Sequence, residues 1–118
     1  MEYKNLDVWI ETRKLTKLVY DLTKSYPKEE IFGLTNQMRR SSVSVPSNIA
    51  EGCGRNTAKE TIHFLFIARG SLFELETQFY LSLDLKYIND KKLATILNQI
   101  ILCKKLINGF INYYRTKQ

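Results

Sequence analysis

The stretch MRRSSVSVPSNIAEG, from Met38 to Gly52, decides the fold class because its pattern fits either a strand or a helix. Residues 42–46, SVSVP, alternate between serine and valine, as a short strand that ends at a proline would. A lone strand among helices, however, would leave its backbone amides without partners. Apolar and small residues also recur every three or four positions, which predicts a helix: Ile31, Leu34, Met38, Ser42, Val45 and Ile49.

Pro46 lies inside this predicted helix and is expected to kink it. Proline has no amide hydrogen, and its ring crowds the carbonyl of Ser42, at a cost of about 3 kcal/mol in a straight helix. A kink lowers this cost. The hydroxyls of Ser41, Ser42 and Ser44 are expected to satisfy the freed backbone groups. These small side chains would also let a neighbouring helix or subunit approach closely.

Helix signals continue before and after this stretch. Apolar residues at helical spacing predict a first helix over about Leu6 to Lys24, with Asn5 as its N-cap. Pro27 is expected at the first position of the second helix, where no amide partner is lost. Gly52 and Gly54 are expected to end that second helix in a left-handed cap.

The second half of the chain predicts two longer helices. Thr57 and Glu60 have the spacing of a capping box, which starts a third helix over about Ala58 to Lys86. Asn89 or Asp90 is expected to cap the fourth helix. Apolar residues of the fourth helix step by three and four over three heptads, the pattern of a helical bundle: Leu93, Ile96, Ile100, Cys103, Ile107, Phe110 and Tyr114.

Four helices joined by short loops predict a single all-α domain over residues 1–118, an antiparallel up-down-up-down four-helix bundle. The third and fourth helices carry more apolar surface than one neighbouring helix would cover. Patches of that size are seldom left exposed on monomers, so we expect a closed homo-oligomer. Its expected interface is an aromatic row on the third helix with two charged neighbours: Phe66, Phe73, Tyr80, Tyr87, Arg69 and Glu76.

Positive charge is concentrated at the end of the chain. The net charge is +6, and residues 90–118 hold six bases against one acid. Such a segment favours an anionic partner such as nucleic acid, because bases attract phosphate and release its counterions. A solvated lysine face that aids solubility is the alternative. The candidate phosphate contacts are Lys91, Lys92, Lys104, Lys105, Arg115 and Lys117, with Arg39, Arg40 and Arg55 as a second group near the other end of the bundle.

Charged residues of the third helix allow another interpretation. Arg69 and Glu76 share a helical row with apolar residues, so their half-buried charges would need partners. In the predicted topology the nearest bases are Arg39, Arg40 and Arg55. The favoured interpretation of Arg69 is an ion-pair network that fixes helix register or the subunit contact. Arg39 and Arg40 stay divided between such pairing and contact with phosphate.

Motifs for catalysis, cofactors or metals are weak. The sequence Gly52-Cys53-Gly54 lacks the preceding strand and third glycine of a dinucleotide fingerprint. Cys53 and His63 are interpreted as packing or surface residues and not as a thiolate pair. One histidine and two cysteines fifty positions apart are too few ligands for a zinc or di-iron site. We therefore expect no cofactor, no metal and no enzymatic activity.

The start of the chain, MEYKNLDVWIETRK, lacks the basic and then apolar order of a signal peptide. The sequence shows no apolar run that approaches the roughly 18 residues needed to span a bilayer. Free thiols are also ordinary in a reducing compartment. A cytoplasmic protein without membrane contact is therefore expected.

Two blocks in the middle of the chain resemble a known family. The segment LTNQMRRSSVSVPSNIAEGCGR, followed by FLFIARGSLFELETQ, is similar to proteins encoded within intervening sequences of bacterial 23S rRNA genes. The resemblance implies an antiparallel four-helix bundle, commonly a ring-shaped homopentamer, with no established enzymatic activity. It also brings in the related accessory variability determinant of diversity-generating retroelements, which is pentameric and basic and binds nucleic acid and a reverse transcriptase.

These observations together predict a non-enzymatic oligomer that binds nucleic acid, with RNA as the expected form, through basic side chains. Contacts to phosphate would make the binding salt-dependent and weakly sequence-specific. The alternative is a protein-interaction scaffold that docks a partner such as a reverse transcriptase and has no direct role with nucleic acid. An enzyme would need a convergent acid, base or nucleophile cluster, and the sequence does not show one.

Overall fold

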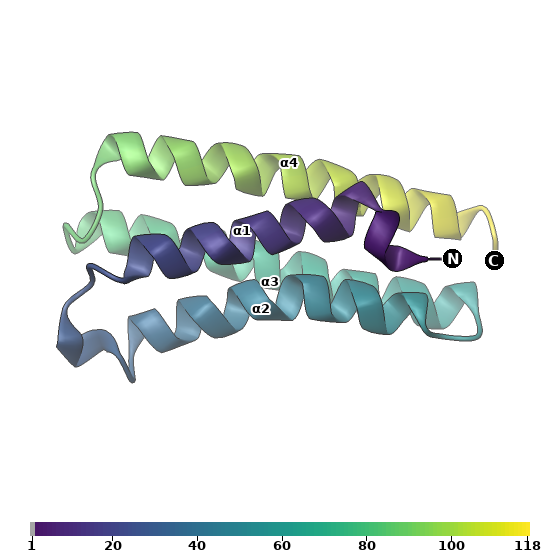
Figure 1. Ribbon diagram of the computed structural model, residues 1–118. Coiled ribbons are helices and arrows are strands. Elements are labelled where there is room, and N and C mark those ends of the chain that lie inside the picture. Colours follow the sequence, from purple (N-terminus) through teal and green to yellow (C-terminus); the bar gives the residue numbers. More distant parts are fainter. Residues whose placement is uncertain (1) are drawn as a thin grey trace.

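The computed structural model describes residues 2–118, which contain helices and no strand. Consecutive long helices run in opposite directions, and each loop turns the chain back (Figure 1). The predicted all-α fold and the helical interpretation of Met38 to Gly52 are confirmed. The long helices are α1 (Asp7–Thr23), α2 (Leu34–Cys53), α3 (Ala58–Asp84) and α4 (Asp90–Arg115). Two short 3-10 helices precede α1 and α2: η1 (Tyr3–Asn5) and η2 (Lys28–Glu30).

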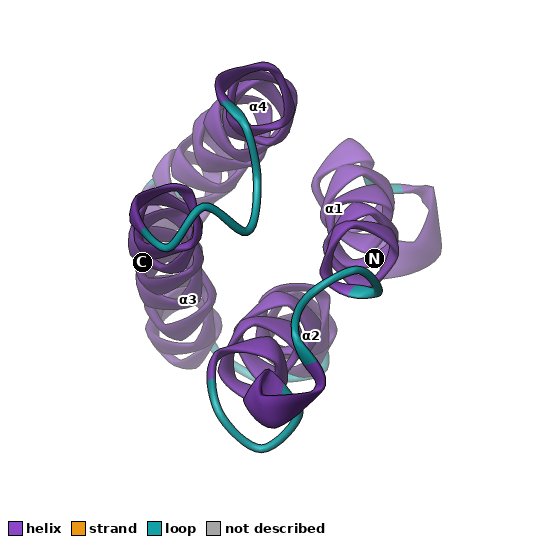
Figure 2. Cartoon of the chain, turned by 90° about the vertical axis from the view of Figure 1, so that its left-hand side faces the viewer, coloured by secondary structure: helices purple, strands orange, loops and turns teal. Residues whose placement is uncertain are grey.

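The four long helices form a bundle that measures 45 × 25 × 21 Å. Seen along its axis, the helices follow one another around the bundle in chain order (Figure 2). Among neighbouring long helices, contact is most extensive between α2 and α3. It is least extensive between α1 and α4, the pair that closes the ring of four helices. The start of α1 and the end of α4 lie at one end of the bundle, and the starts of α2 and α4 lie at the other (Figure 1).

The core lies where the four apolar stripes meet. Helix α3 contributes its main stripe, from Leu65 to Phe79, and these side chains are fully buried. The predicted seam of α4 is also buried, except that Tyr114 is half-buried against the core. Burial of this seam stabilises the bundle because each fully buried aliphatic side chain contributes about 1.5–3 kcal/mol. The buried seam residues are Leu93, Ile96, Ile100, Cys103, Ile107 and Phe110.

Two predicted helix starts are confirmed and two are wrong. The Thr57 hydroxyl oxygen accepts from the Glu60 amide at 3.1 Å, and the Asn89 side chain accepts from the Lys92 amide at 2.8 Å. Leu6, not Asn5, occupies the N-cap of α1, because Asn5 belongs to η1. Pro27 precedes η2, so it does not begin α2. A 3-10 turn thus separates the proline from the second helix.

The predicted left-handed cap of α2 is also wrong. Gly54 ends the helix with φ of −85°, and no glycine in residues 2–118 has a positive φ. Gly52 is buried, and a Cβ there would lie 3.1 Å from Cβ of Phe64 and 3.2 Å from the carbonyl oxygen of Thr61. Its missing side chain therefore lets α2 and α3 approach closely. The left-handed residue is Lys86, with φ of 64°, just after α3.

Helix α2 continues through Pro46, and its freed carbonyl is satisfied by another helix. The Thr16 hydroxyl, on α1, donates to the carbonyl oxygen of Ser42 at 2.9 Å. The expectation that nearby serines satisfy this carbonyl is wrong: the Ser42 hydroxyl donates to Arg39, and the Ser41 hydroxyl donates to Glu74. Accommodation of the proline therefore depends on the packing of α1 against α2.

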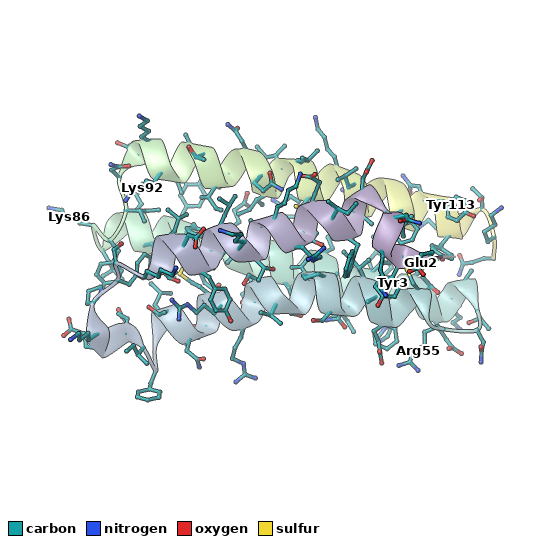
Figure 3. All side chains as sticks on the ribbon, in the orientation of Figure 1. Glu2, Tyr3, Arg55, Lys86, Lys92 and Tyr113 are labelled. Carbon is teal, nitrogen blue, oxygen red and sulfur yellow. The ribbon has the colours of Figure 1, made fainter. Side chains whose placement is uncertain are left out.

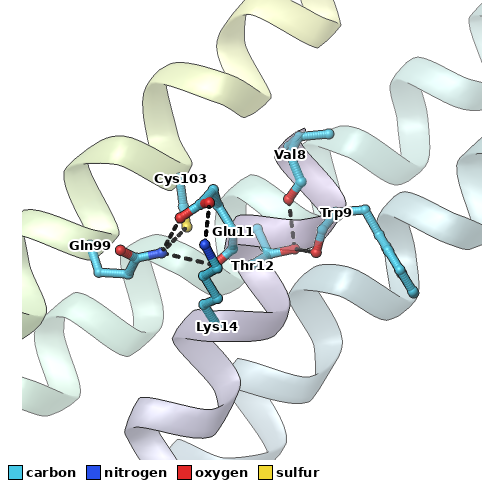
Figure 4. A network of polar contacts seen from close by, with 7 residues as sticks. All are labelled: Val8, Trp9, Glu11, Thr12, Lys14, Gln99 and Cys103. Atoms are coloured by element: carbon cyan, nitrogen blue, oxygen red, sulfur yellow. Dashed lines mark hydrogen bonds and ion pairs between the residues drawn. The ribbon is translucent and has the colours of Figure 1, made fainter. Parts of the chain in front are cut away.

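A polar network joins α1 to α4, the neighbouring long helices with the least extensive contact (Figure 4). The side-chain amide of Gln99 donates to the carbonyl oxygen of Glu11 at 2.9 Å and to its carboxylate at 3.1 Å. The hydrogen bond from Gln99, with help from Lys14, lowers the pKa of Glu11. Cys103 is buried beside this network, and burial raises its pKa to about 12.

Helix α4 has one property that the sequence analysis did not find. By length and composition alone it could cross a membrane, with a mean hydropathy of 1.2 over 18 residues. Core helices of soluble proteins, which are mostly buried, meet the same criterion, whereas 28% of this stretch is buried. The seam of α4 lies in the core. Of its other apolar side chains, Ile101 and Leu102 are exposed, Leu97 and Leu106 are half-buried and Ile111 is buried.

Candidate nucleic-acid interface

The basic residues of α4 extend over its whole length. The buried seam fixes the rotation of the helix, so residues between seam positions, such as Lys91, Lys92 and Lys105, point outward and are exposed. From Lys91 to Arg115 the helix rises about 36 Å at 1.5 Å per residue. Lys92 and Tyr113 accordingly lie at opposite ends of the bundle (Figure 3). These bases, the α4 stripe, therefore extend along the helix on two of its sides and form no compact patch: Lys91, Lys92 and Lys105 line hollows beside α1, whereas Lys104 and Arg115 lie over rings of α3.

Most of these bases have no acidic partner. Lys104 contacts Glu76 on α3, with 2.9 Å between the ammonium nitrogen and a carboxylate oxygen. Within residues 2–118, no other base of this set lies within 4.0 Å of a carboxylate: Lys91, Lys92, Lys105, Arg115 and Lys117. Their charge is balanced only by solvent ions, which is the condition for counterion release on binding phosphate.

Aromatic side chains of α3 lie among these bases. The Phe66 ring has the guanidinium of Arg69 at 4.7 Å from its centroid and that of Arg115 at 5.8 Å. The Phe73 ring has the Lys104 ammonium at 4.1 Å. Residues predicted for a subunit interface and residues predicted to contact phosphate therefore share one face of α3 and α4. Interleaved rings and cations of this kind suit single-stranded nucleic acid, which offers both bases and phosphates.

The aromatic row does not continue to Tyr87. Tyr80 is 47% exposed and extends the row, but Tyr87 is half-buried and packs against Tyr26 at 5.2 Å between ring centroids. Its hydroxyl donates to Glu30 at 2.7 Å. This hydrogen bond raises the pKa of Tyr87 and lowers the pKa of Glu30. The structure thus places Tyr87 in a contact within the chain, between the end of α3 and η2.

The charged residues of α3 find their partners on α4 and not on α2. Arg69 donates to the side-chain oxygen of Asn108 at 3.0 Å, and Glu76 pairs with Lys104. The expectation that Arg39, Arg40 or Arg55 would be the nearest bases is therefore wrong for Glu76, and Arg69, itself a base, contacts an amide oxygen and no carboxylate within residues 2–118. Arg69 and Glu76 lie on the side of α3 that faces α4, its neighbour in the bundle, and this position explains why their partners come from α4.

The three remaining arginines do not form one group. Arg39 and Arg40 lie in the second turn of α2, whereas Arg55 follows its end, about 20 Å away along the helix. Arg55 pairs with Glu51 and covers the Phe64 ring. Arg39 donates to the Thr23 hydroxyl at 3.0 Å and lies over the Tyr20 ring. Neither Arg39 nor Arg40 has an ion-pair partner in the described part of the chain.

The titratable side chains suited to catalysis lie apart from one another. His63 is exposed on α3 and packs edge-on against Phe64. Burial raises the pKa of both Cys53 and Cys103, so each thiol stays protonated near neutral pH and is a weak nucleophile. Residues 2–118 contain no group of three His, Cys, Asp or Glu side chains that could hold a metal ion.

Comparison with known proteins places this geometry in a family. The family model of the 23S rRNA-intervening sequence protein matches residues 4–109. No curated protein matches the chain. The fold is similar to a crystal structure of a protein with unknown function from the S23 ribosomal protein family of Bacteroides thetaiotaomicron VPI-5482, with a TM-score of 0.81, 24% identity, and coverage of 88% of this chain and 97% of that one. Because the family model matches most of its length, the chain belongs to the 23S rRNA-intervening sequence protein family.

Proposed function

We propose that this chain is a non-enzymatic, oligomeric four-helix bundle that binds RNA through basic side chains. The observation that carries the proposal is the stripe on α4, where five of the six bases lack a carboxylate within 4.0 Å in the described residues. Unpaired lysines and arginines bind phosphate more readily than paired ones, because a neighbouring acid competes with phosphate. The family description refers to intervening sequences of 23S rRNA, which supports RNA as the nucleic acid.

Assembly would enlarge this surface. In a ring-shaped homopentamer each subunit would contribute its own stripe, so several weak phosphate contacts would act together on one RNA. The exposed apolar side chains of α3 and α4 supply surface for subunit contact, since Phe73, Tyr80 and Ile101 are each about half exposed. The guanidinium groups of Arg69 and Arg115 lie over Phe66, so the end of this face near Arg115 is proposed to contact RNA.

The proposal is tested by the salt dependence of RNA binding. The affinity for a labelled single-stranded RNA of mixed sequence, measured by fluorescence anisotropy, should fall between about 50 and 200 mM salt. For a protein with many phosphate contacts, the affinity falls on the order of 10³–10⁵-fold over this range. The logarithm of the binding constant should change by about −0.7 per phosphate contact for each unit change in the logarithm of salt concentration. Absence of binding, or binding that ignores salt, contradicts the proposal.

Two triple variants with equal charge change locate the contacts. The first neutralises the α4 end, with Lys105→Gln, Arg115→Gln and Lys117→Gln. The control neutralises three exposed lysines of α1 that are already paired with Glu11 or Asp21: Lys14→Gln, Lys17→Gln and Lys24→Gln. The first should reduce the salt slope by about 2 if all three bases contact phosphate, and the control should change it little. Equal effects of both variants would mean that only net charge matters.

The alternative function is a scaffold that docks another protein, such as a reverse transcriptase. The exposed apolar side chains that favour it lie away from the cation contacts, and they include Leu81 and Leu85 on α3 and Leu102 on α4. A scaffold would retain its pull-down profile when the α4 bases are neutralised, whereas an RNA-binding protein would lose its RNA. Lys104 is omitted from these variants because its ion pair with Glu76 contributes to the structure.

A further inference from the structure

A second surface lies between α1 and α2, and not on the face shared by α3 and α4. An open groove of about 710 Å³ runs beside the start of α2. That volume is within the range of about 300–1,000 Å³ typical of small-molecule sites. Its lining includes both arginines of the second turn of α2, Arg39 and Arg40, together with Tyr20, Phe32, Thr35 and Asn36.

Phe32 gives the groove a free aromatic face. This side chain is 94% exposed, more than any other large hydrophobic residue in the described part of the chain. The Tyr20 ring is already covered by the Arg39 guanidinium at 4.7 Å from its centroid. Phe32 has no aromatic or cationic neighbour of this kind among residues 2–118. Its ring is therefore available to a flat ligand such as a nucleobase.

The charge of the groove is positive. Arg39 is held in place by the Thr23 hydroxyl at 3.0 Å and by Tyr20, whereas Arg40 has no ion-pair partner within the described residues. No acidic side chain lines the groove. Two carboxylates lie just outside its lining: Glu30 accepts from the Leu34 amide at the start of α2, and Glu74, which accepts from Ser41, lines an adjoining hollow together with Arg40. The lining itself thus offers guanidinium groups to an anion.

Thr35 adds an unused polar group. Thr35 is only 4% exposed, it lines the groove, and its hydroxyl has no hydrogen-bond partner in residues 2–118. The amides of Thr35 and Asn36 lie in the first turn of α2, where a helix supplies no backbone acceptor and favours anions. One carboxylate oxygen of Glu30 accepts from the Leu34 amide, and the other accepts from the Tyr87 hydroxyl. A buried hydroxyl without a partner carries a cost that a bound ligand would remove.

We infer that this groove is a nucleotide site for single-stranded RNA. One base stacks on Phe32, and the adjoining phosphate contacts Arg40 and Arg39 at the start of α2, beside Thr35. The inference rests on the proposed function, because it names a second place where the same RNA is bound. It differs from the α4 stripe in requiring an unpaired base, since a base inside a duplex cannot stack on a side chain.

The test compares variants that the fold should tolerate. Phe32 and Arg40 are exposed, so Phe32→Ala and Arg40→Gln should leave the melting temperature unchanged. Phe32→Ala should weaken binding of a labelled single-stranded RNA about 5- to 150-fold, the usual range for loss of one stacked base. Phe32→Trp should restore it, and Phe32→Leu, which keeps the apolar area, should not. Binding of the same sequence as a duplex should be unaffected by Phe32→Ala.

Each outcome bears on one claim. If the unmodified protein binds no RNA, the proposed function fails. If it binds RNA but Phe32→Ala and Phe32→Trp bind single strands equally well, only the groove assignment is overturned. Ultraviolet crosslinking to a uridine-containing RNA should label the peptide that carries Phe32, and labelling confined to α3 and α4 would contradict the assignment. A change of assembly mass in Phe32→Ala would assign the groove to a second subunit and overturn the proposal as well.

Discussion

At the scale of single residues, one region between α2 and α3 contains buried polar groups that have no hydrogen-bond partner within residues 2–118. Three buried side-chain oxygens lack partners within residues 2–118, those of Tyr26, Thr35 and Gln78. Thr35 lines the groove at the start of α2, and Gln78 lines the adjoining hollow that shares Phe32 and Arg40 with it. Unsatisfied buried groups reduce stability, and binding sites are a common place to find them.

Replacement of Thr35 by valine should stabilise the free protein. Valine has the same shape without the unpaired hydroxyl, so the free energy of unfolding should rise by about 1 kcal/mol. Urea denaturation followed by circular dichroism measures this change. The control is Thr12→Val, because the Thr12 hydroxyl donates to the Val8 carbonyl at 2.8 Å and its loss should bring no gain. Equal effects of the two substitutions would contradict the prediction.

The contact between Tyr87 and Glu30 predicts a dependence of stability on pH. Hydrogen bonding holds the pKa of Glu30 below its ordinary value of 4.5, so its contribution is present above pH 4.5 and is lost as the pH falls further. Tyr87→Phe removes the donor and should flatten the acid side of the stability profile. Urea midpoints measured from neutral pH down to about pH 3 would show this. Tyr80→Phe, on an exposed ring, should keep the original profile.

At the scale of the elements, α1 completes the hydrogen bonding of α2. Pro46 cannot donate to the carbonyl of Ser42, and the Thr16 hydroxyl does so from the neighbouring helix. The same hydroxyl lies 3.1 Å from the Thr12 carbonyl oxygen in its own helix. The proline therefore fixes the position of α1 along α2, because the Thr16 hydroxyl must lie opposite the Ser42 carbonyl.

A double-mutant cycle tests this coupling. In the natural chain, Thr16→Val leaves the Ser42 carbonyl without a donor and should cost about 1–2 kcal/mol of the free energy of unfolding. With Pro46→Ala in place, the amide of residue 46 can satisfy that carbonyl, so Thr16→Val should cost about half as much or less. Thermal or urea unfolding of the four proteins gives the coupling energy. A coupling near zero would show that the two groups act independently.

Helix positions could be predicted from the sequence because their signals are local. The seam of α4 and the caps at Thr57 and Asn89 depend on spacing within one helix, and each was found where expected. The partners of Pro46, Arg69 and Glu76 depend on which helices are adjacent and on their relative height, so residue spacing within one helix could not supply them. The groove at Phe32 was missed for the same reason, since it is lined from two helices and the turn that precedes α2.

At the scale of the whole molecule, the basic residues and the exposed apolar residues each extend along the bundle, and the two sets overlap on one face of α3 and α4. The α4 bases reach from one end of the bundle to the other, and Arg39 and Arg40 lie at the end where α4 begins (Figure 1). The aromatic row of α3 has two guanidinium groups over Phe66, near Arg115, and Tyr80 at its other end is 47% exposed. One bundle face can therefore serve RNA near one end and a neighbouring subunit near the other.

Assembly should depend on the open part of this face. If the chain forms the pentamer implied by its resemblance, light scattering should give five times the subunit mass of 13.9 kDa. Tyr80→Ser combined with Ile101→Ser removes exposed apolar area, so the mass should fall toward that of one chain without loss of helix content. Lys14→Gln, on α1, serves as a neutral control for surface substitution. An unchanged mass would place the subunit contact elsewhere.

The buried thiol of Cys103 gives the molecule its own reporter of internal motion. It lies in the seam of α4 beside α1, the neighbouring helix that α4 contacts least, and with a pKa of about 12 it reacts with alkylating reagents only when the seam opens to solvent. Cys53 is half-buried elsewhere and provides an internal comparison in the same chain. Their relative labelling rates, followed by mass spectrometry, would measure how often α1 separates from α4, and whether RNA slows that opening.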